Sequence, residues 1–599
     1  MSSLAWSAMA APKQARWQGA GSPVNSSDTA MGVDEPGYSP VSGVTTTNLT
    51  IDEPRERRGA VVRFVDVVER LVTPLQGKAE LSHQTARVKA GSASMWPVPD
   101  PSGFDLARRL AIVALDHVMD PPRGDDPVVR FATPDQLVAA FEPSVGLTLG
   151  DDAPAHDAKA VLEAAEVVLR YSVHTSHPRF LNQNFAGADP VAVVGDWLAA
   201  ALNTANSTFE IAPVFHMLES ALLAKLANLV GYPGAEPDGP PAELPPGLFC
   251  PGGSVALLYA LQLARHRLQP DLIRAGAGPE RLSVFVSAAG HYGTGKAAAL
   301  LGLGTDAVVE VDTDPDGALR PDALHAAVSA AVAAGCTPLA VVATSGTTVT
   351  CAFDPLDAVA DVCHEHGLWL HVDGCYGASA LFSPDHRYRL AGSERSNSFV
   401  WNLHKMMGMT QQCTALLVRE PERLAACFAT GADYLFQPDK QFGEWDSGDR
   451  TFQCGRRVDA LKLWLTWKAR GDAGFAARID HGVAMADYAR MVIDGSDGEF
   501  ATVADTGFTN VIFLWVPPEL RPLDPWNLDD SIRDRLHRLA PRIKARMQAD
   551  GAAMLAFQPV HGTNAFRLLF MNPAVRPDDV DAVLGHLARY GAEEWATAT

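Results

Sequence analysis

The chain has 599 residues, 47% of them hydrophobic, and 70 acidic against 49 basic residues give it a formal net charge of −21 at pH 7. This length allows roughly two to four domains with a sizeable core. The negative charge argues against nucleic acid or an anionic membrane as a partner, and no apolar run reaches the ~18 residues that a membrane-spanning helix needs.

The cysteines and the first residues of the chain indicate in which cellular compartment we expect the protein. The eight cysteines contain no CxxC pair and are scattered through the middle of the chain. This pattern is typical of reduced thiols rather than of a disulfide framework or a zinc site, and no metal is expected. The opening residues, MSSLAWSAMAAPKQ, lack a basic region followed by a continuous apolar run, so we expect no signal peptide and a cytoplasmic protein.

Two segments precede the first predicted sheet. Residues 1–95 are rich in Ser, Gly, Pro, Ala and Thr, which predicts a flexible low-complexity tail with a short docking helix over 58–71. Residues 96–175 form a helical segment, in which apolar spacing predicts helices over 104–119 and 158–171. Such a segment is small for an independent core, so we expect it to pack against the same region of a second subunit as a dimerisation segment.

Polar groups with possible roles first occur over 177–190. This stretch predicts a loop, in which Gln183 is either a turn amide or a substrate contact. Farther along, Gly253 and Ser254 lie in a turn that opens a helix expected over 255–267. Glycines let the backbone approach a phosphate closely, and the Ser254 hydroxyl can donate to it. Because such turns are common, this phosphate site depends on residues downstream.

A histidine follows the next predicted strand. His291 comes after a strand over 283–288 and before a helix over 296–301. Its flat imidazole could stack on a cofactor ring and contact a reacting carboxylate, or it could simply cap the helix. Strands and helices then continue to alternate over 308–311 and 321–334, which predicts a doubly wound, mostly parallel sheet.

The chemistry of the chain is concentrated between residues 344 and 407. Polar side chains follow the ends of strands expected over 339–343, 368–372 and 398–401, namely Thr347 and Thr348, then Asp373, then His404 and Lys405. Ligands of α/β sheets bind at the carboxyl ends of the strands. Each of these residues alone could be a solvated surface group, but together they predict a pyridoxal-phosphate site.

This cofactor requires an amine, a carboxylate and a phosphate cradle. Lys405 offers a primary amine on a flexible stem, which can bind the cofactor's aldehyde as a Schiff base. Asp373 offers a negative charge that keeps the pyridine nitrogen protonated, so that the ring can accept electrons from the substrate's α-carbon. The turn at Gly253 and Ser254 would hold the phosphate.

The last part of the chain predicts a lid and a second domain. A polar, glycine-bearing loop over 439–449 could serve as a mobile lid. We expect the large domain to span 176–470 and a smaller α+β domain to span 471–599. Arg567 lies within an apolar strand of this smaller domain, where a charge usually has a partner. The simpler interpretation is an ion pair with an acid of the same domain.

Taken together, the chain resembles the pyridoxal-phosphate-dependent group II amino-acid decarboxylases, closest to the glutamate and cysteine-sulfinate decarboxylase branch, over about residues 100–592. The resemblance rests on ordered motifs: HPRFLNQ, FEIAPVF, PGGS, HYGTGKAAALLGLGTD, ATSGTTVTCAFDP, WLHVDGCYG, NLHKMMG, QCGRRVD and FRLLFMNP. It implies an α/β large domain of the aspartate-aminotransferase-like fold (fold type I) with a mostly parallel sheet, an N-terminal helical segment and a small C-terminal α+β domain. It also implies a homodimer with the active site at the subunit interface.

The resemblance assigns roles residue by residue. It implies catalytic roles for Lys405, His291 and Asp373. The cofactor-binding positions that it implies are Gly253, Ser254, His291, Thr348, Asp373, Asn402, His404 and Lys405. Gln183, Arg567 and Phe442 would contact the substrate, Arg567 by clamping its distal acid and Phe442 from a loop that reaches toward the neighbouring subunit. The implied reaction is α-decarboxylation of glutamate, aspartate or cysteine sulfinate with release of CO2.

Several positions depart from the family's pattern. Phe442 replaces a tyrosine thought to protonate the carbanion, and a phenyl ring cannot deliver a proton. One alternative is therefore an aldehyde-forming reaction that couples decarboxylation to oxidative deamination. A further alternative is a pyridoxal-phosphate-binding regulatory subunit with little turnover. Cys375 replaces an alanine beneath the cofactor ring, Ser207 replaces a bulky aromatic residue, and Leu403 replaces a proline.

Overall fold

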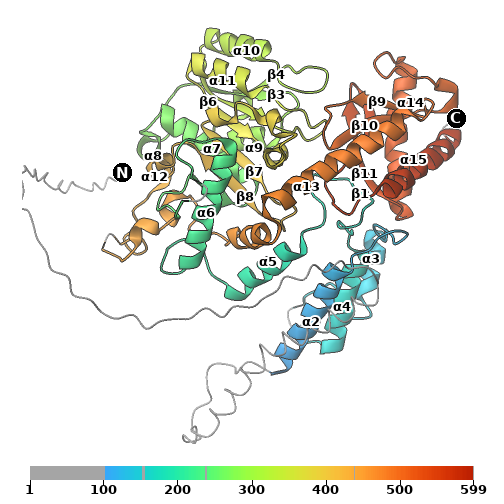
Figure 1. The fold of residues 1–599 in the computed structure, drawn as a ribbon, viewed down its shortest axis with the longest axis horizontal. Helices are drawn as coiled ribbons and strands as arrows, with labels where there is room; N and C mark the ends of the chain where they lie inside the picture. The colour runs from blue at the N-terminus through green and yellow to red at the C-terminus, as the bar shows by residue number, and fades with distance from the viewer. Residues whose placement is uncertain (1–100, 151–154, 237–238, 438, 598–599) are drawn as a thin grey trace, which may run out of the picture. The chain divides into compact units, whose positions relative to one another are not determined.

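A computed structural model describes residues 101–150, 155–236, 239–437 and 439–597 (Figure 1). All of the described residues belong to one compact unit, Pro99–Thr599. The tail predicted over 1–95 and the docking helix over 58–71 lie outside the described residues. Within the described part of the chain, no helix is both long and apolar enough to cross a membrane.

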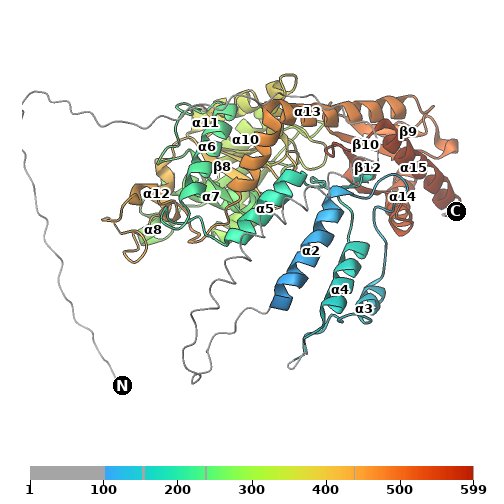
Figure 2. The same ribbon diagram turned by 60° about the horizontal axis from the view of Figure 1, so that its bottom comes forward.

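Three helices begin the described chain: α2 (Pro101–Met119), α3 (Pro134–Phe141) and α4 (Ala158–Tyr171). The Thr133 hydroxyl and the Gln136 side chain form a reciprocal capping box at the start of α3, and the Asp157 carboxylate caps α4. Both α2 and α3 contact α4, and Figure 2 shows the three helices side by side. Their apolar side chains stay largely outside a core, since Leu162 is the buried residue of α4 and α3 has none.

The large sheet has seven strands in the order β2-β8-β7-β6-β5-β3-β4. Their bounds are β2 (Gly247–Cys250), β3 (Leu282–Ser287), β4 (Val308–Val311), β5 (Thr337–Thr344), β6 (Trp369–Asp373), β7 (Ser398–Asn402) and β8 (Thr414–Val418). The pairs β3–β4, β3–β5, β5–β6 and β6–β7 are parallel, and β8 pairs antiparallel with both β7 and β2. This arrangement confirms the mostly parallel sheet predicted from the sequence.

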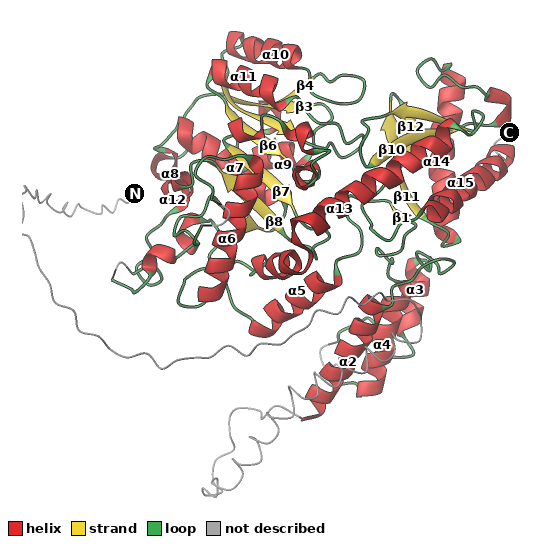
Figure 3. Ribbon diagram, viewed as in Figure 1, coloured by secondary structure: helices red, strands yellow, loops and turns green. Residues whose placement is uncertain are grey.

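Helices cover both faces of this sheet, as Figure 3 shows by colour. They are α5 (Pro190–Leu202), α6 (Pro213–Val230), α7 (Gly253–Leu268), α8 (Leu272–Ala275), α9 (Gly293–Leu300), α10 (Pro321–Ala333), α11 (Leu356–His366), α12 (Glu422–Phe428) and the start of α13 (Ala460–Asp494). Successive strand residues enter different cores: Val284 and Val286 pack with Leu257 of α7, whereas Phe285 packs with Leu324 of α10. The strands are therefore apolar on both faces, which explains their nearly continuous hydrophobic runs.

The second sheet has five strands in the order β1-β11-β12-β10-β9. It comprises β1 (Phe180–Leu181), β9 (Phe500–Ala504), β10 (Asn510–Trp515), β11 (Met554–Val560) and β12 (Thr563–Leu569), with α14 (Asp530–Ala549) and α15 (Pro577–Thr597) packed against it. The prediction of a loop over 177–190 is wrong at Phe180–Leu181, because these residues form β1 and pair in parallel with β11. Helix α13 runs between the two sheets and is kinked at Gly471, whose φ of 66° is left-handed.

Candidate active site

A cavity of about 540 Å³ lies where the parallel strands end. Thr344 closes β5 and pairs in register with Asp373, which closes β6, so their side chains meet at one edge of the sheet. The lining includes every residue for which the sequence implied cofactor contact: Gly253, Ser254, His291, Thr348, Asp373, Asn402, His404 and Lys405. Chain segments far apart in the sequence thus bring one amine, one carboxylate and several hydrogen-bonding groups to a single space.

Asp373 is the negative charge of the cavity. Its carboxylate is buried and accepts a hydrogen bond from the backbone N–H of Cys375 at 3.0 Å. Burial by itself would raise the pKa of Asp373, but the positive charge of Lys405 and the hydrogen bonds from Cys375 outweigh it, and the pKa is lowered. The carboxylate therefore stays ionised inside the protein, as a partner of a cationic ring nitrogen must.

The turn before α7 forms a tight cradle. Gly252 has a left-handed φ of 93°, and a Cβ built on Gly253 would lie 2.5 Å from the Cys375 Sγ. Only a glycine lets the backbone pass there, and the free N–H groups at the start of a helix favour an anion. Ser254 adds an exposed hydroxyl within the same lining. This end of the cavity suits a phosphate.

Asn402 and His404 form the wall beside the cradle. The Asn402 Oδ1 accepts a hydrogen bond from the Thr414 hydroxyl at 2.9 Å, which fixes the orientation of the amide. The His404 Nδ1 contacts the backbone of Cys413 at 2.9 and 3.1 Å, and burial lowers the pKa of His404 to about 4. His404 is therefore a neutral hydrogen-bonding group at physiological pH rather than a cation.

His291 lies both at the start of α9 and in the cavity lining, while its stacking on a cofactor ring stays a prediction. Its Nδ1 accepts a hydrogen bond from the backbone N–H of Gly293 at 3.1 Å, so the ring caps the start of α9, and it also lines the cavity. This cap explains why α9 begins earlier than the helix expected over 296–301. Burial lowers the pKa of His291, although the charge of Asp373 opposes that shift. The hydrogen bond from Gly293 thus fixes the His291 ring in the wall of the cavity that also contains Asp373 and Lys405.

These groups fit pyridoxal phosphate. No side chain of the N-cap residue caps the start of α7 beside Gly253, so the first N–H groups of this helix are available to an anionic ligand. The hydroxyl oxygen of Thr344 lines the cavity, is buried, and has no hydrogen-bond partner among the described residues. A buried hydroxyl without a partner is costly, so a ligand in the cavity would relieve it. The donor set offers an amine for an aldehyde, a carboxylate for a pyridinium and N–H groups for a phosphate.

Arg567 lies behind the cavity wall. The side chain is 5% exposed, and its guanidinium donates to the backbone carbonyl of Thr348 and, at 3.0 Å, to that of Asn182. The ion pair expected as the simpler interpretation is not there, because no carboxylate of the described residues lies within ion-pair distance of Arg567. Burial lowers the pKa of Arg567 to about 10, which still leaves the group charged. It is a buried cation without a countercharge, next to Gln183 in the cavity lining.

A second cation was missed in the sequence. Lys544 of α14 donates to the Asn182 side-chain oxygen at 3.1 Å, and its pKa is lowered by burial and by the charge of Arg567. It forms no ion pair with the described residues either. Lys544 lies in a helix crowded with charges, RDRLHRLAPRIKARMQAD, which looks like a solvated face. Its contacts with Asn182 and with the ring of Phe557, whose centroid lies 5.6 Å from the Lys544 Nζ, distinguish it.

Phe442 lies outside this cavity. The residue is 47% exposed with a left-handed φ of 61°, and its ring centroid is 5.4 Å from that of Phe209. Trp445 packs on the same ring, and Asp446 accepts from the Phe209 N–H at 2.8 Å while pairing with Lys440 at 2.8 Å. The loop is thus fastened to the segment before α6 of its own chain. Contact of Phe442 with substrate stays a prediction that requires a second subunit.

Further lining residues were given no role from the sequence. They are Asn184, Phe185, Leu257, Tyr292, Thr344, Gly346, Tyr376 and Gln411. Thr344 could have been found, because it ends a strand adjacent to the one that ends in Asp373. Cys375 was singled out as a departure, and its thiol indeed lies against the Gly253 cradle.

Comparisons with known proteins agree with this geometry. The conserved domain of pyridoxal-dependent decarboxylases matches residues 147–516. Cysteine sulfinic acid decarboxylase of Homo sapiens is 44% identical over 440 residues, covering 73% of this chain and 86% of that protein, and the Rattus norvegicus protein is 45% identical over 439 residues, with coverages of 72% and 86%. The crystal structure of mouse CSAD matches with a TM-score of 0.75 and 39% identity over 82% of this chain and 100% of that chain. The type I fold predicted from the sequence is confirmed.

Proposed function

This chain belongs to the pyridoxal-dependent decarboxylase family, and we propose that it removes the α-carboxylate of an acidic L-amino acid, with cysteine sulfinate as the leading substrate. Family membership confirms the predicted cofactor, pyridoxal 5′-phosphate, and the predicted class of enzyme. The relatives at 44–45% identity act, by their names, on cysteine sulfinic acid, and they do not favour an aldehyde-forming enzyme or a low-turnover regulatory subunit.

The residues of the cavity divide the work among binding, charge and orientation. When bound, the cofactor supplies an electron sink for the pair released at the α-carbon. Lys405 would hold its aldehyde and exchange that position with the substrate amine. Asp373, kept ionised despite burial, would hold the ring nitrogen in its cationic form. The neutral ring of His291 would stack on the cofactor and orient the departing carboxylate.

The phosphate would be held at the other end of the cavity. Gly253 and Ser254 would present the N–H groups and the hydroxyl at the start of α7, and Asn402 and His404 would complete the wall beside them. Thr348 would contact the cofactor from the turn after β5. Because His404 is neutral, the helix start and hydrogen bonds rather than a second cation would balance the phosphate charge.

The observation that carries the substrate class is the uncompensated positive charge behind Gln183. Arg567 and Lys544 both contact Asn182 and are partly or wholly buried, and neither has a carboxylate partner among the described residues. Buried charges are normally paired, so an anionic group of the ligand would relieve this arrangement. In a chain with a net charge of −21, a local pair of cations also supplies the attraction that an acidic substrate needs.

The assembly and the compartment follow from other features. The helices α2, α3 and α4 expose apolar side chains, including Phe104 at 68% and Ile112 at 45%, in a segment with little core of its own. We propose that this segment covers a second subunit and that the enzyme is a homodimer. All eight cysteines are free, which supports a reducing, cytoplasmic setting.

The decisive experiment measures CO2 release from the holoenzyme with cysteine sulfinate, glutamate, aspartate and a neutral amino acid. We expect Arg567→Gln to lower kcat/KM for the acidic substrates about 100-fold or more, because leaving a buried charge unpaired costs roughly 3–5 kcal/mol. Arg576→Gln, an exposed arginine of the same domain, is the matched control and should change little. Equal use of acidic and neutral substrates by the wild-type enzyme would overturn the proposed substrate class.

A separate measurement tests the cofactor site. Lys405→Ala should lose the visible absorbance of the protein-bound cofactor, because no other amine lines the cavity among the described residues. A Lys405→Ala protein that retains this absorbance would contradict the role given to Lys405. Lys544→Gln should raise KM for acidic substrates by a smaller factor than Arg567→Gln, since Lys544 is only partly buried.

A further inference from the structure

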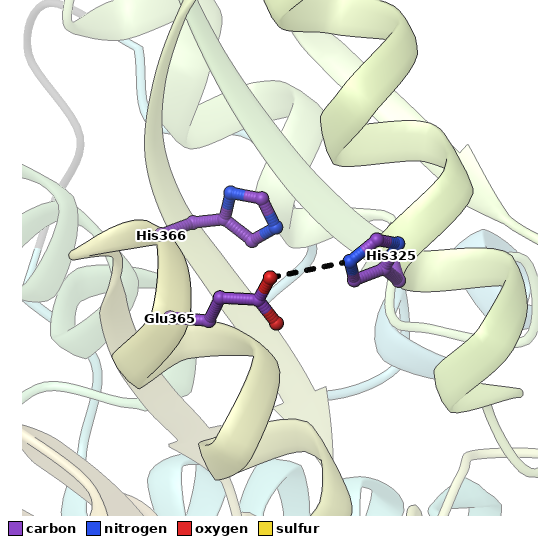
Figure 4. A group of neighbouring side chains, drawn as sticks. All are labelled: His325, Glu365 and His366. Carbon is purple, nitrogen blue, oxygen red and sulfur yellow. Dashed lines mark ion pairs between the residues drawn. The ribbon is translucent and has the colours of Figure 1, made fainter.

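Three side chains capable of binding a metal converge away from the cavity, on two helices that cover the large sheet. Figure 4 shows His325 of α10 facing Glu365 and His366, which are the last two residues of α11. One ligand atom from each of the three lies within 4.8 Å of the others. None of these residues lines the cavity where the strands end. Helix α11 stops directly after them because Gly367 adopts a left-handed φ of 65°.

The three groups approach one another without satisfying one another. The His325 Nε2 lies 3.5 Å from the Glu365 Oε1, a distance at which an ion pair is weak. The rings of His325 and His366 have centroids 5.3 Å apart at an interplanar angle of 59°, so they are neither stacked nor hydrogen-bonded. The His366 Nε2 is buried and has no hydrogen-bond partner among the described residues. A buried ring nitrogen of this kind normally has a partner.

We propose that His325, Glu365 and His366 form a binding site for a divalent transition-metal ion, with Zn²⁺, Ni²⁺ and Co²⁺ as the class of ligand. Two imidazoles and one carboxylate are a donor set that these metals accept, and water would complete the coordination. Ligand atoms around a tetrahedral ion lie about 3.3 Å apart, given metal–ligand bonds of about 2.0–2.1 Å. Small rotations of the His325 and Glu365 side chains, which are both exposed, would close the remaining gap. Ca²⁺ and Mg²⁺ prefer oxygen ligands and are not expected.

A metal here would join two helices that contact each other and pack on neighbouring strands. Helix α10 contacts β3, β4 and β5, and α11 contacts β5 and β6. The three ligands come together only when both helices are packed, so the ion would bind the folded protein and stabilise it. Such a site is independent of the decarboxylase reaction, because the cavity lies at the ends of the strands and draws on other residues.

The test titrates the metal-free holoenzyme with Co²⁺ at about pH 7.5, where histidine is largely neutral. We expect one equivalent of Co²⁺ to bind, with visible bands of nitrogen and oxygen ligation and without the sulfur-to-cobalt band that Cys454 or Cys336 would produce. The variants His325→Ala, Glu365→Gln and His366→Gln should each bind at least tenfold more weakly. His364→Ala removes another exposed histidine of α11 and should bind as the wild type does.

Thermal unfolding gives the second readout. Added Ni²⁺ should raise the unfolding midpoint of the wild type and of His364→Ala, and it should leave that of His325→Ala unchanged. Because His325 is exposed, its replacement by alanine should preserve the fold, which the metal-free unfolding midpoint and the CO2-release rate would verify. Absence of Co²⁺ binding to the wild type, or undiminished binding to His325→Ala, would overturn the proposal.

Discussion

The buried ion pair between Glu219 and Arg456 offers the sharpest test of how the fold holds the loop over 439–449 against α6 and β2. The Glu219 side chain of α6 is 5% exposed and that of Arg456 is 3% exposed, and their nearest atoms lie 2.6 Å apart. The same carboxylate accepts from the backbone N–H of Phe249 at 2.9 Å and from the Asn206 side chain. Arg456 also donates to the Ser447 hydroxyl at 2.8 Å, which ties the base of the loop to β2.

Glu219→Gln keeps the size of the side chain and removes its charge. Burial alone would lower the pKa of Arg456, but Glu219 outweighs this and raises it, so the substitution leaves a buried guanidinium without its countercharge. The new side-chain amide has one oxygen where the carboxylate had two. Its NH2 group would therefore face N–H donors that have lost their acceptor. Breaking one partner of a buried pair costs roughly 3–5 kcal/mol. Proteins are usually stable by only about 5–15 kcal/mol, so this loss is large.

The assay is urea unfolding of the holoenzyme, followed by tryptophan fluorescence. Glu163→Gln is the matched control, because it makes the same substitution in an exposed ion pair. The Glu163 side chain is 46% exposed and that of its partner Lys159 is 81% exposed. Exposed helical pairs contribute about 0.3–0.5 kcal/mol, so this control should move the midpoint little. A shift for Glu219→Gln no larger than that for Glu163→Gln would refute the reasoning.

Three further predictions concern the cavity and the sheet. Gly253→Ala should weaken cofactor binding about tenfold or more, because the new Cβ would lie 2.5 Å from the Cys375 Sγ. A double variant that also carries Cys375→Ala should bind the cofactor again, as measured by its absorbance. Because the relatives at 44–45% identity are decarboxylases by name, the wild type should release CO2 without matching oxygen uptake. Stoichiometric oxygen uptake that Phe442→Tyr abolishes would instead support the oxidative alternative. Burial lowers the pKa of His371 from 6.5 to about 4 in the folded protein, so between these pH values the unfolded chain binds a proton that the folded protein does not. The free energy of unfolding should therefore fall as the pH drops from 6.5 to about 4. His371→Asn should flatten that fall when unfolding is measured as a function of pH.

The cofactor end of the site was predictable because its residues follow local patterns. Asp373 and Lys405 each come just after an apolar run, and parallel strands place the ends of such runs at one edge of the sheet. The sequence around Gly253 predicted a turn that opens a helix. Helix 158–171 could be predicted to the residue, since Asp157 caps it and apolar spacing marks its face.

The substrate end was less accessible to sequence reasoning, because its contacts are between residues far apart in the chain. Arg567 stood out as a charge in an apolar strand, but its lack of an acidic partner became visible only in three dimensions. Lys544 shares Asn182 with it across the domain, and no periodicity records such a contact. The packing of Phe442 on Phe209 was likewise not predicted, because the sequence of a loop does not specify which surface the loop packs against.

The pairing of β1 with β11 makes Phe180 and Leu181 part of the second sheet, while Gln183, two residues on, belongs to the cavity lining. Only Asn182 separates Leu181 from Gln183, so a shift of the five-stranded sheet would be passed on to the wall of the cavity. Substrate affinity should therefore respond to substitutions in β11 that never touch the substrate.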